Sequence, residues 1–221
     1  MKTRKGLKLT IFVVLLLVID QVIKILVKTN MTLGESIHVF GDWFQLYFVE
    51  NLGMAFGMQF GGSIGKLLLS LFRIVLVVAI IIYMRNLLRK SDTPTGVLFG
   101  LAAILCGALG NIIDSLFYGV IFSESTFTQV AELFPATGGY SKFLFGKVVD
   151  MFYFPIIDTD LPAWFPIWGG RHIIFFRPIF NFADSCVTVG AFYLILFQWK
   201  FFSTHPIKFS DKGEGEDEAT E

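Results

Sequence analysis

The chain has 221 residues, of which 54% are hydrophobic and 16% are charged. Soluble domains carry about 25% charged residues and fewer apolar ones, so this composition excludes an ordinary soluble globule. The 18 basic and 18 acidic side chains cancel, which leaves no positive excess for binding nucleic acid. A disulfide scaffold is excluded because Cys106 and Cys186 are the only cysteines, and we expect both to be packing residues. The composition favours a small multi-pass membrane protein with an aromatic-rich interfacial part.

Four stretches are long and apolar enough to cross a bilayer: 7–27, 67–84, 97–116 and 182–202. The first follows several basic residues, as in a signal peptide. However, Asp20, Gln21 and Lys24 interrupt it, and no small-residue cleavage site follows. We therefore predict that this helix is retained, in a single mainly α-helical membrane domain over residues 1–202.

Basic residues predict the orientation of the spans, because they gather on the cytoplasmic side. They flank the first helix, the connection between the second and third, and the end of the fourth: Lys2, Arg4, Lys5, Lys8, Arg85, Arg89, Lys90, Lys200, Lys208 and Lys212. Both termini should then be cytoplasmic, with the connections 29–66 and 117–181 outside. Residues 203–221 are polar and acidic, which predicts a disordered cytoplasmic tail.

The two outer connections do not resemble ordinary soluble loops. Residues 37–49 and 151–180 are rich in aromatic and β-branched side chains, which favour strands. In 37–49 both faces of the predicted strands are apolar. We therefore expect a small strand-rich platform that lies against the bilayer at the outer membrane interface.

Carboxylates inside membrane-spanning helices are costly and invite a functional explanation. Asp20 and Lys24 are spaced i, i+4 and can form an ion pair, whose simplest role is structural. The third helix carries a stripe of small residues that ends in an aspartate and predicts close helix packing: Gly96, Gly100, Ala103, Gly107, Gly110 and Asp114. Asn111 and Asp114 should therefore point into the bundle.

The fourth predicted helix begins with Asn181 and Asp184, and on its own Asp184 could simply stabilise the helix N-terminus. The topology, however, places Asp20, Asp114 and Asp184 towards the outer leaflet. Asp150 lies in the outer connection between the third and fourth helices. Two close carboxylates in a poorly solvated site share a proton and can act as general acid and general base. This arrangement suits hydrolysis of a peptide bond by water.

Other chemistries are less consistent with the sequence. The only G-x-S-x-G match, at 61–65, lacks a strand-to-helix turn and indicates a hinge. The three histidines of the chain, His38, His172 and His205, are scattered and no H-E-x-x-H motif is present, so we expect no metal site. A small proton-coupled transporter stays open as an alternative, because buried carboxylates also relay protons. A non-catalytic scaffold braced by carboxylates stays open as well.

The motifs in chain order resemble the lipoprotein signal peptidases, the type II signal peptidases of bacteria. The resemblance rests on Asp20-Gln21-x-x-Lys24, Asn51-x-Gly53-x-Ala55-Phe56, Gly107-Ala108-x-Gly110-Asn111-x-x-Asp114, Val148-Val149-Asp150 and Phe180-Asn181-x-Ala183-Asp184-Ser185. It implies an aspartic endopeptidase of the bacterial inner membrane that cuts diacylglyceryl-modified prolipoproteins just before the lipidated cysteine. Family members use no cofactor and are inhibited by cyclic peptides such as globomycin. Besides its substrates, we expect only membrane lipids as partners, and a monomer.

The resemblance also implies roles for individual residues. Asp150 and Asp184 correspond to the catalytic pair, and Asp20 and Lys24 to supporting residues. A further set corresponds to residues that line the pocket or hold the substrate: Asn51, Gly53, Asn111, Asp114 and Asn181.

The chain departs from the family pattern in two places. Ser115 replaces an arginine that many members carry after the helix-three aspartate, so any contact of that arginine must come from elsewhere, for which Arg171 and Arg177 are candidates. The connection 117–147 is longer than the family suggests, with room for an amphipathic helix or a flap over the site.

Overall fold

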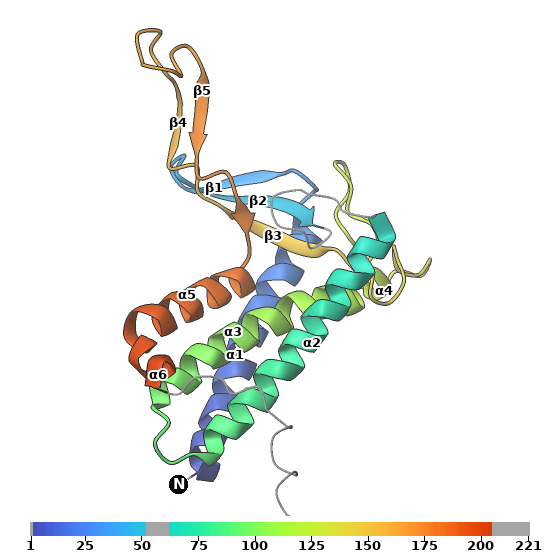
Figure 1. Ribbon diagram of the computed structural model, residues 1–221. Coiled ribbons are helices and arrows are strands. Elements are labelled where there is room, and N and C mark those ends of the chain that lie inside the picture. Colours follow the sequence, from blue (N-terminus) through green and yellow to red (C-terminus); the bar gives the residue numbers. More distant parts are fainter. Residues whose placement is uncertain (1, 52–61, 205–221) are drawn as a thin grey trace, which may run out of the picture.

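The computed structural model describes residues 2–51 and 62–204, with backbone alone for residues 2, 3, 62 and 63. Four helices form its main body (Figure 1): α1 (Lys2–Asn30), α2 (Gly62–Arg89), α3 (Thr95–Ile113) and the shorter α5 (Phe182–Phe197). α3 continues through one π-helical turn, η2 (Asp114–Tyr118), into the single turn α4 (Gly119–Ile121). Gly53 and the predicted tail beyond residue 204 lie outside the described residues.

Three of the four predicted spans are long enough to cross a membrane, namely Arg4–Asn30, Ile64–Arg89 and Thr95–Ile121. The prediction of one continuous helix over 182–202 is wrong. α5 ends at Phe197, because the backbone of Gln198 leaves the helical region (φ −121°, ψ 7°) while its side chain donates to Tyr193 Oη at 3.1 Å. The chain then resumes as α6 (Trp199–Thr204). At 1.5 Å per residue, the 16 residues of α5 span roughly 24 Å.

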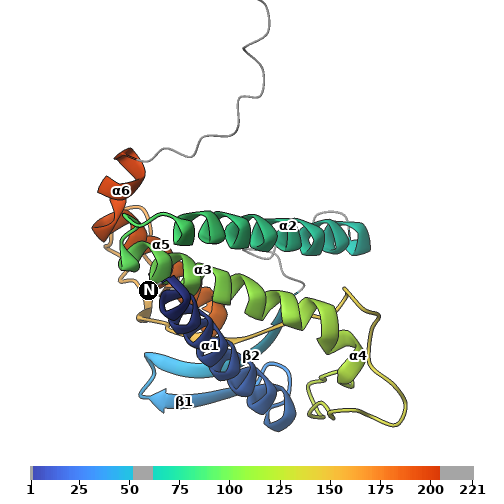
Figure 2. The ribbon, with the colours of Figure 1, turned by 90° about the horizontal axis from the view of Figure 1, so that it is seen from below.

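α3 lies between α1 and α2, as the view from below shows (Figure 2). Its predicted small-residue face packs against α5 so closely that a Cβ at Gly107 would lie 2.2 Å from the carbonyl oxygen of Ala183. On the other side, Leu98 and Leu101 form a buried core with α2. The outer faces of α1 and α2 expose large apolar side chains, as lipid contact requires: Leu15, Val18, Val22, Leu68, Val75 and Ile82.

A four-stranded antiparallel sheet covers one end of the bundle (Figure 1). Its strand order is β1 (Ser36–Phe40), β2 (Phe44–Asn51), β3 (Val148–Tyr153) and β6 (Ile179–Phe180). Both regions predicted to form strands do so, although 37–49 divides into β1 and β2 around a turn. Phe48, Val149 and Met151 are fully buried against the end of α1 and against η2.

A separate two-stranded hairpin, β4 (Ile157–Asp160) and β5 (His172–Phe175), projects from this sheet (Figure 1). At its base, aromatic rings stack from the β1–β2 turn to β6: Phe44 and Phe154 are 4.5 Å apart between centroids, and Phe154 and Phe180 are 5.7 Å apart. The small sheet that the sequence predicts is therefore present, with aromatic rings stacked beside it.

The long outer connection does not form the amphipathic helix for which the sequence has room. Its first residues complete η2 and α4, and residues 122–147 are irregular apart from one bridge between Phe122 and Leu133. This connection is fastened to the helices, since Ala131 N donates to Lys28 O at 3.2 Å and Lys66 Nζ donates to Phe145 O at 2.7 Å. It therefore packs beside the sheet as a fixed layer.

Candidate functional site

Asp150 lies in the middle of β3 and is 3% exposed. Both of its oxygens accept hydrogen bonds from amide side chains: Oδ1 from Asn181 Nδ2 at 2.6 Å, and Oδ2 from Asn51 Nδ2 at 3.2 Å. Asn51 reaches Asp150 because β2 pairs with β3 so that Asn51 stands opposite Val148, two residues from Asp150 on the same face.

Asp184 lies in the first turn of α5 and is partly exposed. Asn181 caps this helix, with its Oδ1 accepting from Asp184 N at 2.9 Å while Asp184 Oδ2 accepts from Asn181 N at 3.3 Å. The other oxygen of Asp184 accepts from Asn111 Nδ2 at 2.8 Å. The simple capping role considered from the sequence is thus present, together with a contact that capping does not require.

The two aspartates are joined through the side chains of Asn181 and Asn111. Asn181 contacts the Asp150 carboxylate through Nδ2 and the Asp184 carboxylate through its backbone nitrogen, and its Nδ2 also donates to Asn111 Oδ1 at 3.1 Å. Asn111 Oδ1 in turn accepts from Lys24 Nζ at 2.9 Å. Side chains from α1, α3, β3 and α5 therefore meet in one hydrogen-bonded group.

Beside this pair lies a group here called the buried brace, which consists of the fully buried Asp20, Lys24 and Asp114 and the partly buried Gln21. Lys24 Nζ is 3.1 Å from Asp20 Oδ2 and 2.8 Å from Asp114 Oδ2, which confirms the predicted Asp20–Lys24 pair and adds a second partner. Gln21 Nε2 donates to both aspartates, at 3.0 and 3.1 Å.

The buried brace also fastens the two catalytic candidates to the bundle. Asp20 Oδ1 accepts from Ala183 N at 2.9 Å, next to Asp184. Asp114 Oδ2 accepts from Val149 N at 3.3 Å, next to Asp150. Asp114 is 0% exposed and both of its oxygens are engaged, so in this structure it lies within the brace and does not face an open pocket.

Burial and, after it, the nearby charge of Asp184 raise the pKa of Asp150 to about 7. The donors Asn51 and Asn181 act in the opposite direction, because hydrogen bonds to a carboxylate favour its ionised form. Near neutral pH, Asp150 is therefore present in both protonated and ionised forms. A group in this state can give or take a proton during a reaction.

Sequence reasoning missed Arg73 of α2, whose positive charge acts on Asp184, Asp150 and Asp114. The two arginines suggested as substitutes for the missing one, Arg171 and Arg177, are instead exposed on the segment around β5. Arg73 lies inside an apolar stretch. A charged residue within a predicted membrane span is the signal that could have identified it.

Over residues 2–51 and 62–204, no three His, Cys, Asp or Glu side chains are grouped so as to hold a metal ion. His172 pairs instead with two exposed carboxylates of β4, those of Asp158 and Asp160, each at 2.9 Å. Cys106 and Cys186 are buried, unbridged thiols, in agreement with a packing role.

Comparison with known proteins identifies similar chains. The family model for signal peptidase (SPase) II matches residues 12–200. A lipoprotein signal peptidase of Porphyromonas gingivalis is 53% identical over 192 residues, which are 87% of this chain and 83% of that protein. One from Amoebophilus asiaticus is 36% identical over 196 residues, covering 88% and 78%.

Two solved structures described as bacterial membrane enzymes share the fold. The first has a TM-score of 0.57 at 22% identity and covers 92% of this chain and 94% of its own. The second has a TM-score of 0.53 at 23% identity and covers 86% and 90%.

Proposed function

The chain belongs to the signal peptidase II family, whose members are aspartic-type peptidases, and on this premise we propose that it cleaves the signal peptides of prolipoproteins with Asp150 and Asp184 as its catalytic pair. One observation carries this assignment of residues. A single side chain, that of Asn181, contacts Asp150 and caps the helix turn that contains Asp184. Two carboxylates from distant parts of the chain thereby meet in one hydrogen-bonded group.

The environments of the two aspartates support different roles. Asp184 is the more exposed and acts as the base that takes a proton from the attacking water. The water oxygen bonds to the scissile carbonyl carbon. Asp150, with a pKa of about 7, then gives its proton to the amide nitrogen as the carbon–nitrogen bond breaks. Asn51, Asn111 and Asn181 hold the two carboxyl groups in place during these transfers.

The buried brace supports this chemistry from below the pair. Lys24 lies between the carboxylates of Asp20 and Asp114, so it balances their negative charge next to the catalytic pair. We assign Asp20, Lys24 and Asp114 this supporting role. Gly53, which lies outside the described residues, keeps its proposed place in the pocket lining by resemblance alone.

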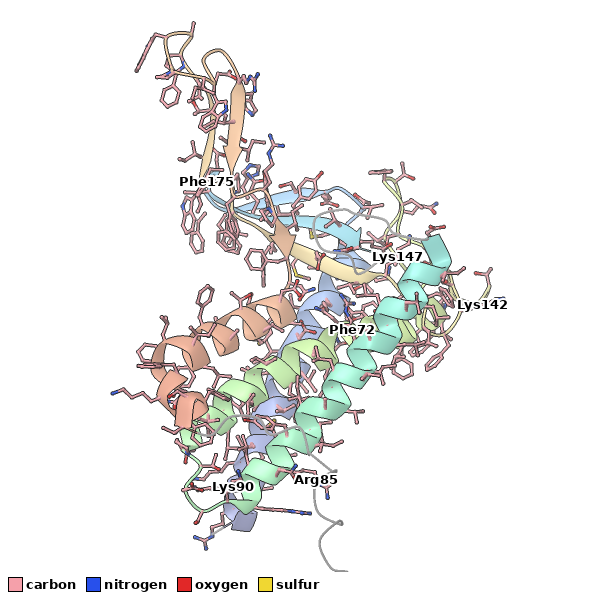
Figure 3. All side chains as sticks on the ribbon, viewed as in Figure 1. Phe72, Arg85, Lys90, Lys142, Lys147 and Phe175 are labelled. Carbon is pink, nitrogen blue, oxygen red and sulfur yellow. The ribbon has the colours of Figure 1, made fainter. Side chains whose placement is uncertain are left out.

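We further propose the placement of the enzyme in the inner membrane. Arg85 and Lys90 lie at the end of α2 opposite to the sheet, whereas Lys147 lies beside the sheet (Figure 3). The positive-inside rule then supports cytoplasmic termini, with the sheet and its aromatic rings at the outer interface. The substrate is a diacylglyceryl-modified precursor cut before its lipidated cysteine, and globomycin-type cyclic peptides are expected inhibitors of a monomeric enzyme.

A cleavage assay on the purified protein in lipid nanodiscs tests this function. Asp150→Asn and Asp184→Asn each remove a proton-transfer group with little change in shape, so cleavage of a lipidated precursor should fall by roughly 100-fold or more. Asp158→Asn, in the exposed β4 strand, is the matched control and should cleave at the original rate. Undiminished turnover in either of the first two variants would overturn the assignment.

A further inference from the structure

A second group of charged side chains lies near the aspartate pair and is not used by the mechanism above. We call it the Glu50 cluster: Lys28 of α1, Glu50 of β2, and Ser125, Tyr140 and Lys147 of the long outer connection. Glu50 Oε1 accepts from Lys28 Nζ and, at 2.9 Å, from Ser125 Oγ. Its Oε2 is 3.1 Å from Lys147 Nζ.

The Lys28–Glu50 pair at the centre of the cluster is shielded from water. The side chains of Lys28 and Glu50 are 0% and 2% exposed. The ring of Tyr140 covers both ammonium groups, with its centroid 5.0 Å from Lys28 Nζ and 5.2 Å from Lys147 Nζ. Its hydroxyl also accepts from the backbone nitrogen of Lys147 at 2.6 Å.

Glu50 and Lys147 each favour the charged form of the other. Burial alone would raise the pKa of Glu50, but Lys28 and Lys147 outweigh it and hold this pKa below its ordinary value. Burial lowers the pKa of Lys147, but Glu50, followed by Glu124, outweighs it and raises this pKa. Apolar side chains of the same size often stabilise a fold as well as a buried ion pair does, so stability is a weak explanation for these residues.

The position of Glu50 in the sheet gives a better explanation. Glu50 stands opposite Val149 and immediately precedes Asn51, which stands opposite Val148. Asn51 donates to Asp150 Oδ2, and Val149 is the residue before Asp150. The Glu50 cluster therefore anchors β2 to α1 and to the outer connection at the point where β2 positions the donor to Asp150.

We propose that Glu50 is a positioning residue for peptide cleavage: held by Lys28 and Lys147, it fixes the end of β2 so that Asn51 keeps its hydrogen bond to Asp150. This inference rests on the proposed function of Asp150. It also gives a role to the long outer connection, which supplies three members of the cluster and thereby couples its own packing to the active site.

Loss of the hydrogen bond from Asn51 changes the pKa of Asp150 in a predictable direction. The charged groups that act on Asp150 include Asp184 of α5, Lys24 of α1 and Arg73 of α2, which all lie outside the Glu50 cluster. Asp114 of η2 lies close to Asp150, since its Oδ2 accepts a hydrogen bond from the backbone nitrogen of the preceding residue, Val149. In this proposal the effect of neutralising Glu50 reaches Asp150 through Asn51, the next residue of β2. Without this donor the pKa of Asp150 rises, and an acid with a higher pKa stays protonated to higher pH.

The test compares Glu50→Gln, Glu50→Asp and Glu124→Gln in nanodiscs, with kcat and KM measured against pH. Glu124 is the matched control, because it pairs with Lys147 at 3.3 Å but is 65% exposed. Glu50→Gln should lower kcat roughly tenfold with KM little changed, and should move the alkaline limb of the pH profile upward. Glu50→Asp should recover part of both effects, and Glu124→Gln should match the original protein.

If Glu50→Gln does not fold, Lys147→Gln removes one partner of Glu50 from a partly exposed position and should shift the alkaline limb in the same direction by less. A purely structural cluster would lower the melting temperature of these variants while kcat and the limb stay unchanged, and that outcome would overturn the inference. Retained cleavage by Asp150→Asn would instead overturn the proposed function. The two failures are therefore distinguishable.

Discussion

Asn181 Nδ2 donates to Asp150 Oδ1 across 2.6 Å, although 31 residues separate the two along the chain. The same asparagine is the N-cap of α5, whose first turn contains Asp184. Helix capping and alignment of the proposed catalytic pair thus depend on one side chain.

Asn181→Ser should keep the cap and lose the contact with Asp150. Serine is as good an N-cap residue as asparagine, but its shorter side chain does not reach β3. We expect a melting temperature close to the original and a large fall in kcat. Asn181→Ala should also lose about 1 kcal/mol of stability, because the cap is gone. Equal kcat in Asn181→Ser and the original protein would show that the contact with Asp150 is dispensable.

Asp150→Asn should make the protein more stable at high pH. Because its folded pKa of about 7 lies above the ordinary value of 3.8, the folded state holds its proton more tightly than the unfolded state does. The contribution of Asp150 to the free energy of unfolding is fully present below pH 4. It is lost as the pH rises to 7, by roughly 4 kcal/mol at most.

The measurement is thermal unfolding of both proteins at pH 5 and pH 8. The variant should gain more over the original protein at pH 8 than at pH 5. A difference in melting temperature that does not depend on pH would contradict the raised pKa.

Lys24→Met should destabilise the fold strongly, because it leaves Asp20 and Asp114 buried without their cation. Removing one partner of a buried ion pair costs about 3–5 kcal/mol. Adding Asp114→Asn to the same protein should recover part of this loss, since one uncompensated charge is removed. Thermal unfolding of the single and double variants measures the coupling, and strictly additive effects would argue against the brace.

Gly107→Ala should disturb the contact between α3 and α5. The added Cβ would meet the backbone of Ala183, which cannot move without shifting Asp184 with it. Overpacking of this kind costs about 1–3 kcal/mol, and we expect cleavage to fall together with stability. Gly6→Ala is the matched control, because nothing lies within 4 Å of its Cβ position.

Local periodicity was enough to predict part of the site. The Asp20–Lys24 pair and the small-residue face of α3 follow from helical spacing, and both are present. The roles of Asn111 and Asn181 as a bridge between the aspartates could not be derived in this way. That bridge depends on how α3, β3 and α5 meet, which is set by tertiary packing.

The errors have physical causes as well. The predicted span over 182–202 includes Gln198 in an apolar run. In the structure the helix ends before Gln198, whose side chain donates to Tyr193. The outer connection has no periodic pattern, because its backbone is set by contacts to distant residues such as Lys28 and Lys66. Glu50 was overlooked for the same reason, since its partners come from α1 and from that connection.

The most direct test of the central claim is the pH dependence of kcat/KM for a lipidated precursor. If Asp184 is the base and Asp150 the acid, the profile should be bell-shaped, with an alkaline limb near pH 7 that reports loss of the Asp150 proton. A rate that stays constant from pH 5 to pH 9 would contradict catalysis by this pair of aspartates.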